Sequence, residues 1–482
     1  MGNKIIEIIK KKWLQSAVLT ILLFAIIICA FLGISYGIKK LNITDLDFTE
    51  DKIYSISQAT KDKLENLDQE ITISIYNMYD YVSDFAYKYA ALNNNIKIEK
   101  LDNLTAKTDW KSEFGISESS SFIVIQSKTK SKLLQESDLH TYDYTTYEQI
   151  DVTEEAITNA ILDVVTNVKP KICFLTGHNL YSDGYFQYLE NSLTSEVNEV
   201  EYLNLLTSGS IPDDCKLLVL TTLKEDIDQK EKDEILKYIN NGGEILLLLD
   251  PNLNNIKTPN FQSILDEYGI KNSNGFIIEG DSNKMVSGAP LYIIESINTN
   301  SELVKNVNMG LNVCMMTAGK LTFDSTEELE KKNVTMETLA TASEKAFYRT
   351  DLTSSSSSKI SSDEDASGAI VAAMLTKKFD DNKNSKLIVF ANTAFATNAQ
   401  IPMGTYYRYA IEFVNNKDVI LNAVSYLTER EDNITIRKSG ETVTTYDVTE
   451  NQLRIVLGIT IGIPVFIVIL GIVIWQVRRR KK

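Results

Sequence analysis

The sequence predicts an α/β protein in which a body of alternating strands and helices lies between two membrane-spanning ends. Two long apolar runs, residues 13–38 and 455–477, contain no charged residue, and each has a basic cluster on its outer side. Between residues 171 and 249, short apolar runs alternate with segments of helical periodicity. Strands that are apolar throughout and alternate with helices are typical of a doubly wound, mostly parallel sheet.

The two apolar runs are long enough to cross a membrane, because a bilayer core of about 30 Å requires about 20 helical residues. We therefore expect transmembrane helices at residues 13–38 and 453–477, flanked by cytoplasmic basic tails at residues 1–12 and 478–482. Basic residues beside a span stay on the cytoplasmic side. The sequence thus predicts a two-pass plasma-membrane protein, held in the lipid bilayer, with both termini cytoplasmic and the body extracytoplasmic. A cleaved signal peptide fits poorly, since its apolar core is usually about 7 to 15 residues.

The body between the spans is strongly acidic. The protein has a formal net charge of −16, from 49 basic and 65 acidic residues. The two tails hold nine of the basic residues and one of the acidic residues, which leaves 40 basic and 64 acidic residues for the rest of the chain. Such a charge argues against a basic groove for nucleic acid. Roughly 410 residues between the spans also exceed one hydrophobic core, so two or more domains are expected.

Residues 39–168 are expected to form a small α/β subdomain. One helix begins after the N-cap residue Ser57, and another is predicted with Thr153 as its N-cap. Between them lie three β-rich runs and one aromatic helical segment, at residues 71–76, 96–101, 121–126 and 79–92. The dipeptide Lys169-Pro170 marks the boundary to the next domain, because the residue before a proline disfavours the helical conformation.

Residues 169–430 are expected to form the doubly wound domain. Asp228 and Glu231 make a capping box at the start of one of its helices, and Gly242-Gly243 ends that helix. The pattern loosens in an insertion at about residues 274–375, which contains a Ser-rich loop. A stalk at residues 431–452 leads to the second span. The strands and helices are predicted at residues 171–175, 185–193, 216–220, 229–239, 244–249, 386–391 and 417–427.

Four residues make up a candidate ligand crevice. In a doubly wound sheet, the crevice lies outside the carboxyl ends of the strands. Thr176, Gly177 and His178 directly follow the first predicted strand of the domain, and Asp250 follows the strand at residues 244–249. A binding or catalytic role of His178 competes with a simpler role in a turn or a hydrogen bond, which is the commoner use of a lone histidine.

The sequence contains none of the common catalytic or phosphate-binding motifs. It has no G-x-x-x-x-G-K-[ST] phosphate loop and no G-x-G-x-x-G. It also lacks a G-x-S-x-G nucleophile elbow, a cysteine version of that elbow, and the H-E-x-x-H metal motif. We therefore predict that the protein is not an enzyme and binds no cofactor or metal.

Scattered acidic residues and cysteines are expected to have structural roles. Asp250, Glu279, Asp281 and the acidic run at residues 363–365 could each bind a cation, but they lack calcium-loop spacing, so they are interpreted as solvated surface. The cysteines of the body lie far apart in or beside apolar runs, which favours core positions, although one pair remains able to form a disulfide. These cysteines are Cys173, Cys215 and Cys314.

Five sequence segments, taken in order, carry a family resemblance. They are Asp47-Phe48-Thr49 with Tyr54-Ser55-Ile56-Ser57, residues 169–178 (KPKICFLTGH), Ile211-Pro212 before 217–220, residues 238–251 with Gly242-Gly243, and Asn416-Lys417-Asp418 before 421–423. Together they resemble the GldG-like family, the gliding-motility-associated auxiliary components of ABC-type transport systems. Gliding itself is not implied by this likeness.

The resemblance implies a non-catalytic partner of an ABC permease and its ATPase, with a sheet similar to glutamine-amidotransferase-like domains but without their catalytic cysteine. We therefore expect a membrane-anchored auxiliary subunit whose external domain contacts the permease, a cargo or the cell envelope. Two alternatives stay open. One is a membrane-tethered, amidotransferase-like hydrolase that uses His178, and the other is an anchored surface module for binding or adhesion.

Overall fold

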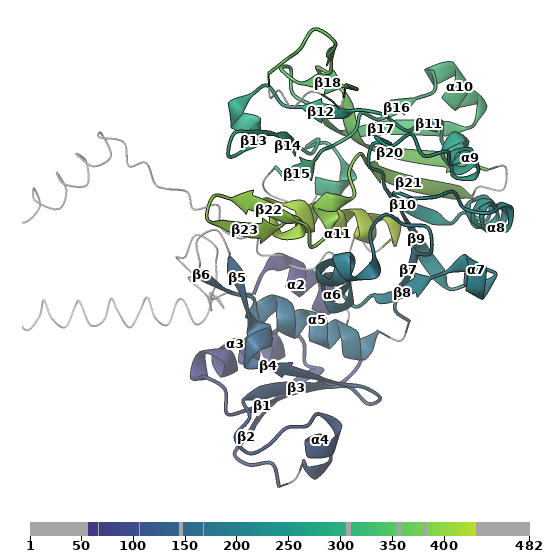
Figure 1. Ribbon diagram of the computed structural model, residues 1–482. Helices are drawn as coiled ribbons and strands as arrows, with labels where there is room; N and C mark the ends of the chain where they lie inside the picture. Colours follow the sequence, from purple (N-terminus) through teal and green to yellow (C-terminus); the bar gives the residue numbers. More distant parts are fainter. Residues whose placement is uncertain are drawn as a thin grey trace, which may run out of the picture.

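The computed structural model describes residues 56–429, apart from residues 66, 106, 144–147, 167, 305–309, 352, 354–357 and 380–382. These residues form two bodies (Figure 1). The smaller body holds the elements from α2 to α5 and lies at the bottom of the view, and the larger body holds the elements from β7 to α11 above it.

The smaller body is a four-stranded sheet covered by helices. Its strand order is β2-β1-β3-β4, with β1 parallel to β2 and antiparallel to β3. Ile71, Ile73 and Ile75 alternate along β1 and are buried in one apolar cluster with residues of α3 and α5. The elements are α2 (Gln58–Glu65), β1 (Ile71–Tyr76), α3 (Asp80–Leu92), β2 (Ile96–Leu101), α4 (Thr108–Glu113), β3 (Phe122–Gln126), β4 (Ser131–Gln135), β5 (His140–Asp143), β6 (Glu148–Asp151) and α5 (Thr153–Val165).

Helix α5 begins differently from the prediction. Thr153 is its first helical residue and not its N-cap, which is Val152. The backbone N–H of Thr153 donates to the Asp151 carboxylate at 2.8 Å, so a side chain two residues upstream supplies the acceptor that the helix start requires.

The larger body is built on a seven-stranded mixed sheet in the order β17-β20-β21-β10-β9-β7-β8. The strands from β21 to β8 pair in parallel, whereas β20 and β17 extend the sheet in antiparallel pairing. The bounds of the strands are β7 (Lys171–Leu175), β8 (Glu199–Leu203), β9 (Cys215–Thr221), β10 (Glu244–Leu248), β17 (Val334–Thr341), β20 (Ile370–Lys378) and β21 (Asn384–Phe390).

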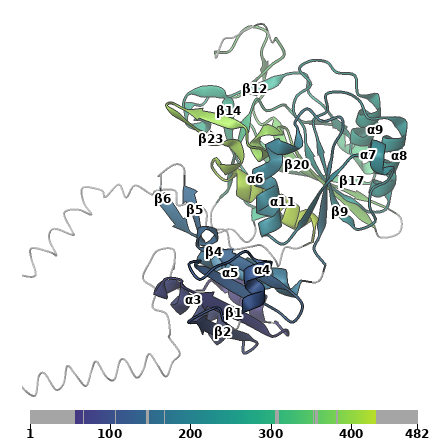
Figure 2. The same cartoon turned by 60° about the horizontal axis from the view of Figure 1, so that its bottom comes forward.

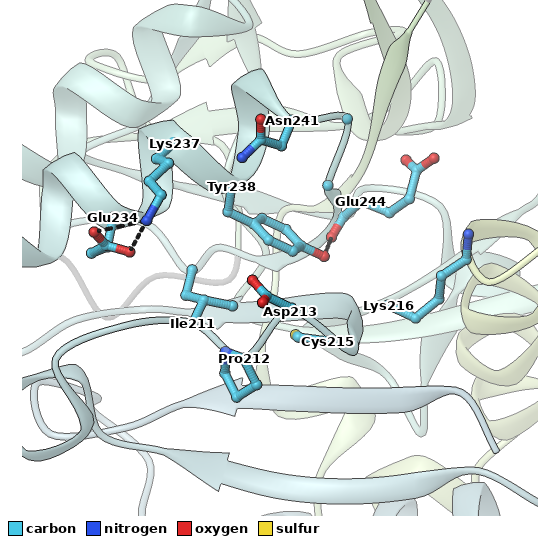
Figure 3. A pocket seen from close by; sticks show the side chains of 12 residues that line it. Ile211, Pro212, Asp213, Cys215, Lys216, Glu234, Lys237, Tyr238, Asn241 and Glu244 are labelled. Atoms are coloured by element: carbon cyan, nitrogen blue, oxygen red, sulfur yellow. Dashed lines mark hydrogen bonds and ion pairs between the residues drawn. The ribbon is translucent and has the colours of Figure 1, made fainter. Parts of the chain in front are cut away.

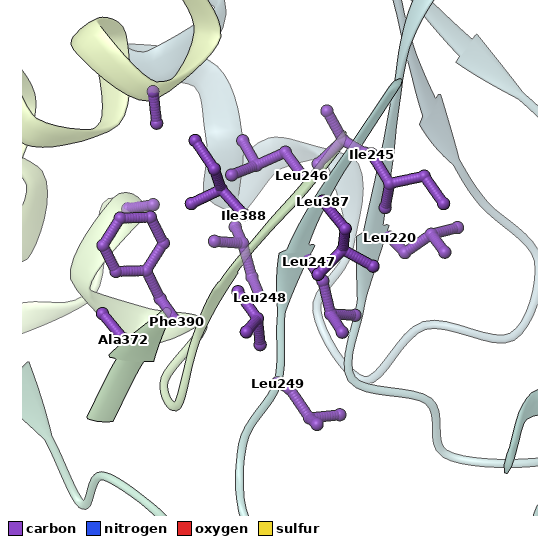
Figure 4. Close-up of a cluster of buried hydrophobic side chains, with 14 of the residues drawn as sticks. Leu220, Ile245, Leu246, Leu247, Leu248, Leu249, Ala372, Leu387, Ile388 and Phe390 are labelled. Atoms are coloured by element: carbon purple, nitrogen blue, oxygen red, sulfur yellow. The ribbon is translucent and has the colours of Figure 1, made fainter. Parts of the chain in front are cut away.

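Helices cover both faces of this sheet (Figure 2). Helices α6 (Gln187–Ser195) and α11 (Asn416–Leu427) lie on one face, and α7 (Leu205–Ser208), α8 (Gln229–Asn240) and α9 (Pro259–Glu267) lie on the other. Every residue of β10 is buried, as expected of a central strand covered on both sides. Figure 4 shows the side chains of β10 interleaved with those of its neighbours β9 and β21 in the core.

Short sheets decorate the end of the domain. They are formed by β11 (Ile270–Lys271) with β16 (Thr322–Phe323), by β12 (Phe276–Ile278) with β18 (Phe347–Arg349) and β19 (Glu364–Asp365), by β13 (Met285–Val286) with β14 (Ala289–Ser296) and β15 (Asn312–Met316), and by β22 (Gln400–Met403) with β23 (Tyr406–Tyr409). A short helix, α10 (Thr326–Lys331), precedes β17.

The acidic residues of this region are not simply solvated surface. Arg349 and Asp363 form a buried bidentate pair, in which Nε and Nη2 of the arginine donate to the carboxylate at 2.8 and 2.7 Å. Glu279 is buried and accepts a hydrogen bond of 2.6 Å from the Ser343 hydroxyl. The interpretation as solvated surface is therefore wrong for Asp363, Glu279 and the likewise buried Asp250, because partners brought by distant segments bury them.

The predicted transmembrane ends are corrected by the structure. Within residues 56–429 as described, no helix is both long and apolar enough to cross a bilayer. The helices α3 and α5 have 13 residues each, which corresponds to about 20 Å against a membrane core of about 30 Å. The runs at 13–38 and 453–477 fall outside the described residues. The fold class is accordingly corrected to mixed α/β, and the extracytoplasmic location stays a prediction.

The cysteines of the described residues are free thiols. Cys173, Cys215 and Cys314 are all buried, and none of them is in a disulfide. Burial raises the pKa of the Cys314 thiol to about 12. Their roles are those of small core residues.

Candidate functional site

The predicted crevice lies where the strand order reverses, between β7 and β9. The chain runs from β7 to its neighbour β8 and then crosses to β9 on the other side of β7. The loops that follow β7 and β9 pair with each other at this point. The backbone N–H of Leu180 donates to Thr222 O, and the N–H of Lys224 donates to His178 O, both at 2.8 Å. The two loops therefore pair with each other at the switch point, and Leu180 and Thr222 also line a pocket at these strand ends.

The side chain of Asn179 strengthens this pairing. Its amide nitrogen donates to Leu175 O at 2.6 Å and to the Thr221 hydroxyl at 2.8 Å. These acceptors are the last residues of β7 and β9. One amide thus joins the carboxyl ends of the two strands on either side of the switch point.

Thr176 and Gly177 pack against the end of β8. The N–H of Thr176 donates to Leu203 O at 2.8 Å. Gly177 has a φ of +111°, a conformation that glycine tolerates best, and a Cβ atom at this position would lie 3.4 Å from the Asn204 side chain. These two residues shape a tight turn and line neither of the two pockets described below.

His178 contacts acidic side chains at the start of α8. Its Nε2 atom lies 3.0 Å from Glu231 Oε2, and its Nδ1 atom lies 3.7 Å from Glu225 Oε1. Glu231 belongs to the capping box that the sequence predicted: its Oε2 accepts from Asp228 N, while its own N–H donates to Asp228 Oδ1, both at 2.8 Å. The imidazole therefore lies against a helix-capping residue, although neither of its ring nitrogens makes a hydrogen bond of good geometry within the described residues.

Asp250 lies apart from the other three predicted residues, in a pocket of about 340 Å³. The pocket opens beyond the ends of β9, β10 and β15, and neither His178 nor its two neighbours line it. Of the four predicted crevice residues, Asp250 is the one that lines this pocket. The lining residues are Leu180, Tyr181, Thr222, Leu223, Leu249, Asp250, Pro251, Asn252, Leu253, Asn254, Ile256, Thr258, Phe261, Asn272, Met316, Thr317 and Ala394.

A hydrogen-bond network fixes the Asp250 carboxyl group. Oδ1 accepts from Thr393 N at 2.7 Å and from the Asn392 amide at 3.0 Å, and Asp250 N donates to the Thr222 hydroxyl at 2.6 Å. Oδ2 is buried and has no hydrogen bond of good geometry among the residues the structure describes, although the Tyr181 hydroxyl lies near enough to the carboxyl group to lower its pKa. Burial raises the pKa of Asp250, because desolvation disfavours the carboxylate.

Tyr181 and Met316, which also line the pocket, are connected to Asp250, the second of them through Asn392. Burial raises the pKa of the Tyr181 hydroxyl, and the charge of Asp250 raises this pKa further. Asn392 donates to Met316 O at 2.7 Å, which connects the end of β15 to the same network. The next residue, Thr317, has a φ of +58°, a strained conformation for a β-branched side chain. Such strain concentrates at functional sites.

Sequence reasoning missed Asn392 and Thr393. They directly follow the predicted strand at residues 386–391, so the rule that selected Asp250 also applied to them. Both are buried between strand ends in the structure. Applying the rule to every predicted strand of the sheet would have found them.

A second pocket, of about 220 Å³, lies at the opposite end of the strands, where they begin (Figure 3). It is formed where β9 and β10 begin and α8 ends. The Tyr238 hydroxyl crosses it and donates to Glu244 O at 3.1 Å. Burial raises the pKa of the Glu244 carboxyl to about 7, although its side chain accepts a hydrogen bond from Lys386 N. Within the described residues, no three His, Cys, Asp or Glu side chains are grouped to hold a metal ion.

A comparison with protein families identifies the family to which the larger body belongs. A family model described as an ABC-type uncharacterized transport system, ABC_transp_aux, matches residues 169–423, which is more than half of the 482 residues. The chain belongs to this family. The ABC_transp_aux match runs from β7 into α11 and therefore includes the Asp250 pocket. The narrower GldG-like assignment stays a prediction.

The other comparisons add no function. A domain of unknown function, DUF7088, matches residues 50–137. No curated protein matches the chain.

Solved structures share parts of the architecture at low identity. The mmIFT52 N-terminal domain has 16% identity over 53% of this chain and 97% of its own, with a TM-score of 0.39. A putative ThuA-like protein from Parabacteroides merdae has 12% identity over 54% and 90%, with a TM-score of 0.32. A glutamine amidotransferase from Thermotoga maritima has 11% identity over 55% and 96%, with a TM-score of 0.27. TM-scores this low carry no functional argument.

Proposed function

We propose that the protein is a non-catalytic auxiliary subunit that contacts the permease and ATPase of an ABC transporter. The observation that carries the proposal is the family match over residues 169–423, which supports an auxiliary role in transport. Contact with those two subunits is the finer part of the proposal.

The arrangement around His178 favours a structural role over hydrolysis. A hydrolase of the amidotransferase type requires a nucleophile within hydrogen-bond reach of its base. The ionisable groups that the imidazole approaches are Glu231 and Glu225, which are acids and not nucleophiles of that type. The close contact between His178 and Glu231 supplies no such nucleophile, because Glu231 is a carboxylate that takes part in the capping of α8.

The smaller body offers a surface for the permease on α3. The inner face of this helix is buried through residues such as Phe85 and Tyr89, while Tyr79, Tyr81 and Tyr87 are exposed. The rings of Tyr79 and Tyr81 stack with their centroids 6.1 Å apart. Exposed aromatic side chains are enriched in protein interfaces. We propose that these exposed tyrosines, called the tyrosine face below, contact the permease.

Affinity purification of the full chain from its native source tests the proposal. We expect an ABC permease and an ATPase to copurify in reproducible ratio. The double variant Tyr79→Ala/Tyr87→Ala should reduce their recovery at unchanged thermal stability, whereas Leu206→Ala, at an exposed leucine on α7 of the larger body, should not. Failure to enrich either subunit over an unrelated bait would refute the auxiliary role. If the permease and ATPase are recovered equally well with the tyrosine double variant and with Leu206→Ala, only the contact through the tyrosine face is refuted.

A further inference from the structure

The Asp250 pocket has an unusual distribution of charge. Among its lining residues there is no lysine, arginine or histidine, and Asp250 is the one charged side chain. The remaining polar lining consists of uncharged threonine and asparagine side chains and the Tyr181 hydroxyl. A carboxylate without an opposing cation in such a cavity disfavours anionic ligands and favours cationic ones.

The two carboxyl oxygens of Asp250 differ in the hydrogen bonds that they accept. Oδ1 accepts two hydrogen bonds, from Thr393 N and the Asn392 amide. Oδ2 has none within the described part of the chain, although Asp250 is about nine-tenths buried. A buried acceptor without a donor destabilises the folded state. A ligand that donates to Oδ2 would remove this penalty.

Apolar side chains form much of the remaining wall. Leu249 and Phe261 are buried at its base, and Leu180 is 54% exposed at its edge. At about 340 Å³, the pocket has the size of small-molecule sites, which combine apolar walls with a few fixed polar groups. It therefore fits a compact ligand that is apolar apart from one donor group.

We propose that this pocket binds a small molecule in which a protonated amine is attached to an apolar body, with the amine donating to Asp250 Oδ2. The apolar body lies against Leu180, Leu249 and Phe261. Anions are excluded because no cationic side chain lines the pocket. The inference goes beyond the proposed function, since an auxiliary subunit needs no small-molecule site, and neither depends on the other.

Tyr181 lies beside Asp250 in the pocket. It lines the pocket, is partly buried, and its hydroxyl is near enough to Asp250 for each group to affect the pKa of the other. Because Oδ2 is covered in the structure, the proposed contact requires a neighbouring side chain such as Tyr181 to move aside. The strained residue Thr317 sits on the same wall, and the Asn392 network keeps Asp250 in place during this change.

Three probes of similar size and different charge test the proposal. Benzylamine, benzyl alcohol and benzoate share one ring and carry a cation, a neutral donor and an anion. Their binding to the full chain is measured by calorimetry and ligand-observed NMR at pH 7.5. We expect benzylamine to bind at least about tenfold more tightly than benzyl alcohol, because a hydrogen bond between two charged groups is the stronger one, and benzoate not to bind.

Two variants locate the site. Asp250→Asn should remove the preference for benzylamine over benzyl alcohol. Leu180→Ala should weaken benzylamine binding severalfold, while Leu206→Ala, an equally exposed leucine outside the pocket, should leave it unchanged. Thermal unfolding reports whether each variant is folded. If Asp250→Asn does not fold, the comparison between the two leucine variants decides.

Several outcomes would overturn the inference. They are absence of benzylamine binding, binding of benzoate or benzyl alcohol as tight as that of benzylamine, and unchanged benzylamine binding in a folded Asp250→Asn or Leu180→Ala variant. Copurification of an ABC permease is unaffected by any of these results, so failure of this inference is distinguishable from failure of the auxiliary role.

Discussion

The imidazole of His178 lies 3.0 Å from the carboxylate of Glu231, the third residue of α8 and a member of its capping box. The side chain of Glu231 is almost completely buried, with 2% of its surface exposed. The histidine that looked most suited to chemistry in the sequence is thus a partner of a buried helix cap.

Replacing His178 with alanine should therefore affect stability and not association. We expect His178→Ala to lower the free energy of unfolding by about 1–3 kcal/mol, because the buried Glu231 carboxylate loses a partner. His178→Gln, which keeps a donor, should lower it less. Urea denaturation measures both values. Loss of cellular function in His178→Ala at unchanged stability would instead support the hydrolase alternative.

The capping box itself makes a separate prediction. Asp228→Ala removes the acceptor for the N–H of Glu231, and the loss of an N-cap acceptor lowers stability by about 0.5–2 kcal/mol. Lys230 is exposed and lies between the two residues of the box in the sequence. Lys230→Ala is therefore the matched control and should change stability by less than about 0.5 kcal/mol. Equal effects of the two substitutions in denaturant titrations would show that the box contributes nothing.

The buried pair of Arg349 and Asp363 should be essential for the fold of the decorated end. Arg349→Met leaves the Asp363 carboxylate buried without its cation, which is destabilising by about 3–5 kcal/mol. The double variant Arg349→Met/Asp363→Leu should be less destabilised than the single one, because no charge is left buried. Unfolding titrations of both variants decide this, and a double variant at least as unstable as the single one would contradict it.

Glu244 makes the stability of the larger body dependent on pH. Its pKa is raised by burial from 4.5 to about 7, so between these values the folded state holds a proton that the unfolded state has lost. Stability therefore falls as the pH rises from about 4.5 to 7, by up to about 3 kcal/mol, and levels off above pH 7. Glu295, whose pKa burial also raises to about 7, adds to the same decline.

Substitution separates the two contributions. In Glu244→Gln the decline in unfolding free energy between pH 5 and pH 7.5 should be shallower than in the wild type, and the remaining slope comes largely from Glu295. Glu234→Gln, at a more exposed residue of the same pocket, is the control and should keep the wild-type slope. An unchanged slope in Glu244→Gln would show that this carboxyl group ionises normally.

The strands of the main sheet were predicted from the sequence with different success. The predicted strands at 171–175, 216–220 and 244–249 coincide with β7, β9 and β10 to within one residue at either end, because central strands are continuous apolar runs. Edge strand β8 was missed. Its sequence, EVEYL, alternates acidic and apolar residues, and Glu199 and Glu201 are accommodated by contacts with Lys171 on the neighbouring strand.

The candidate site could be predicted only in part. The position of Asp250 at a strand end is a local signal, and the structure places it in a pocket. The pairing of the loop at Leu180 with Thr222 at the switch point is a contact between distant segments that no local pattern encodes. No local pattern predicted the positions of β17 and β20 in the sheet either. These strands lie largely within the segment interpreted as an insertion, and yet they extend the main sheet in antiparallel pairing.

The most direct test of the auxiliary role is the binding of the purified full chain to the purified permease–ATPase complex copurified with it or encoded beside it. Biolayer interferometry with the immobilised complex gives the dissociation constant. The account predicts saturable binding with a dissociation constant in the micromolar range or tighter, weakened at least about tenfold by Tyr79→Ala/Tyr87→Ala. Absence of saturable binding by the folded wild-type chain would contradict it.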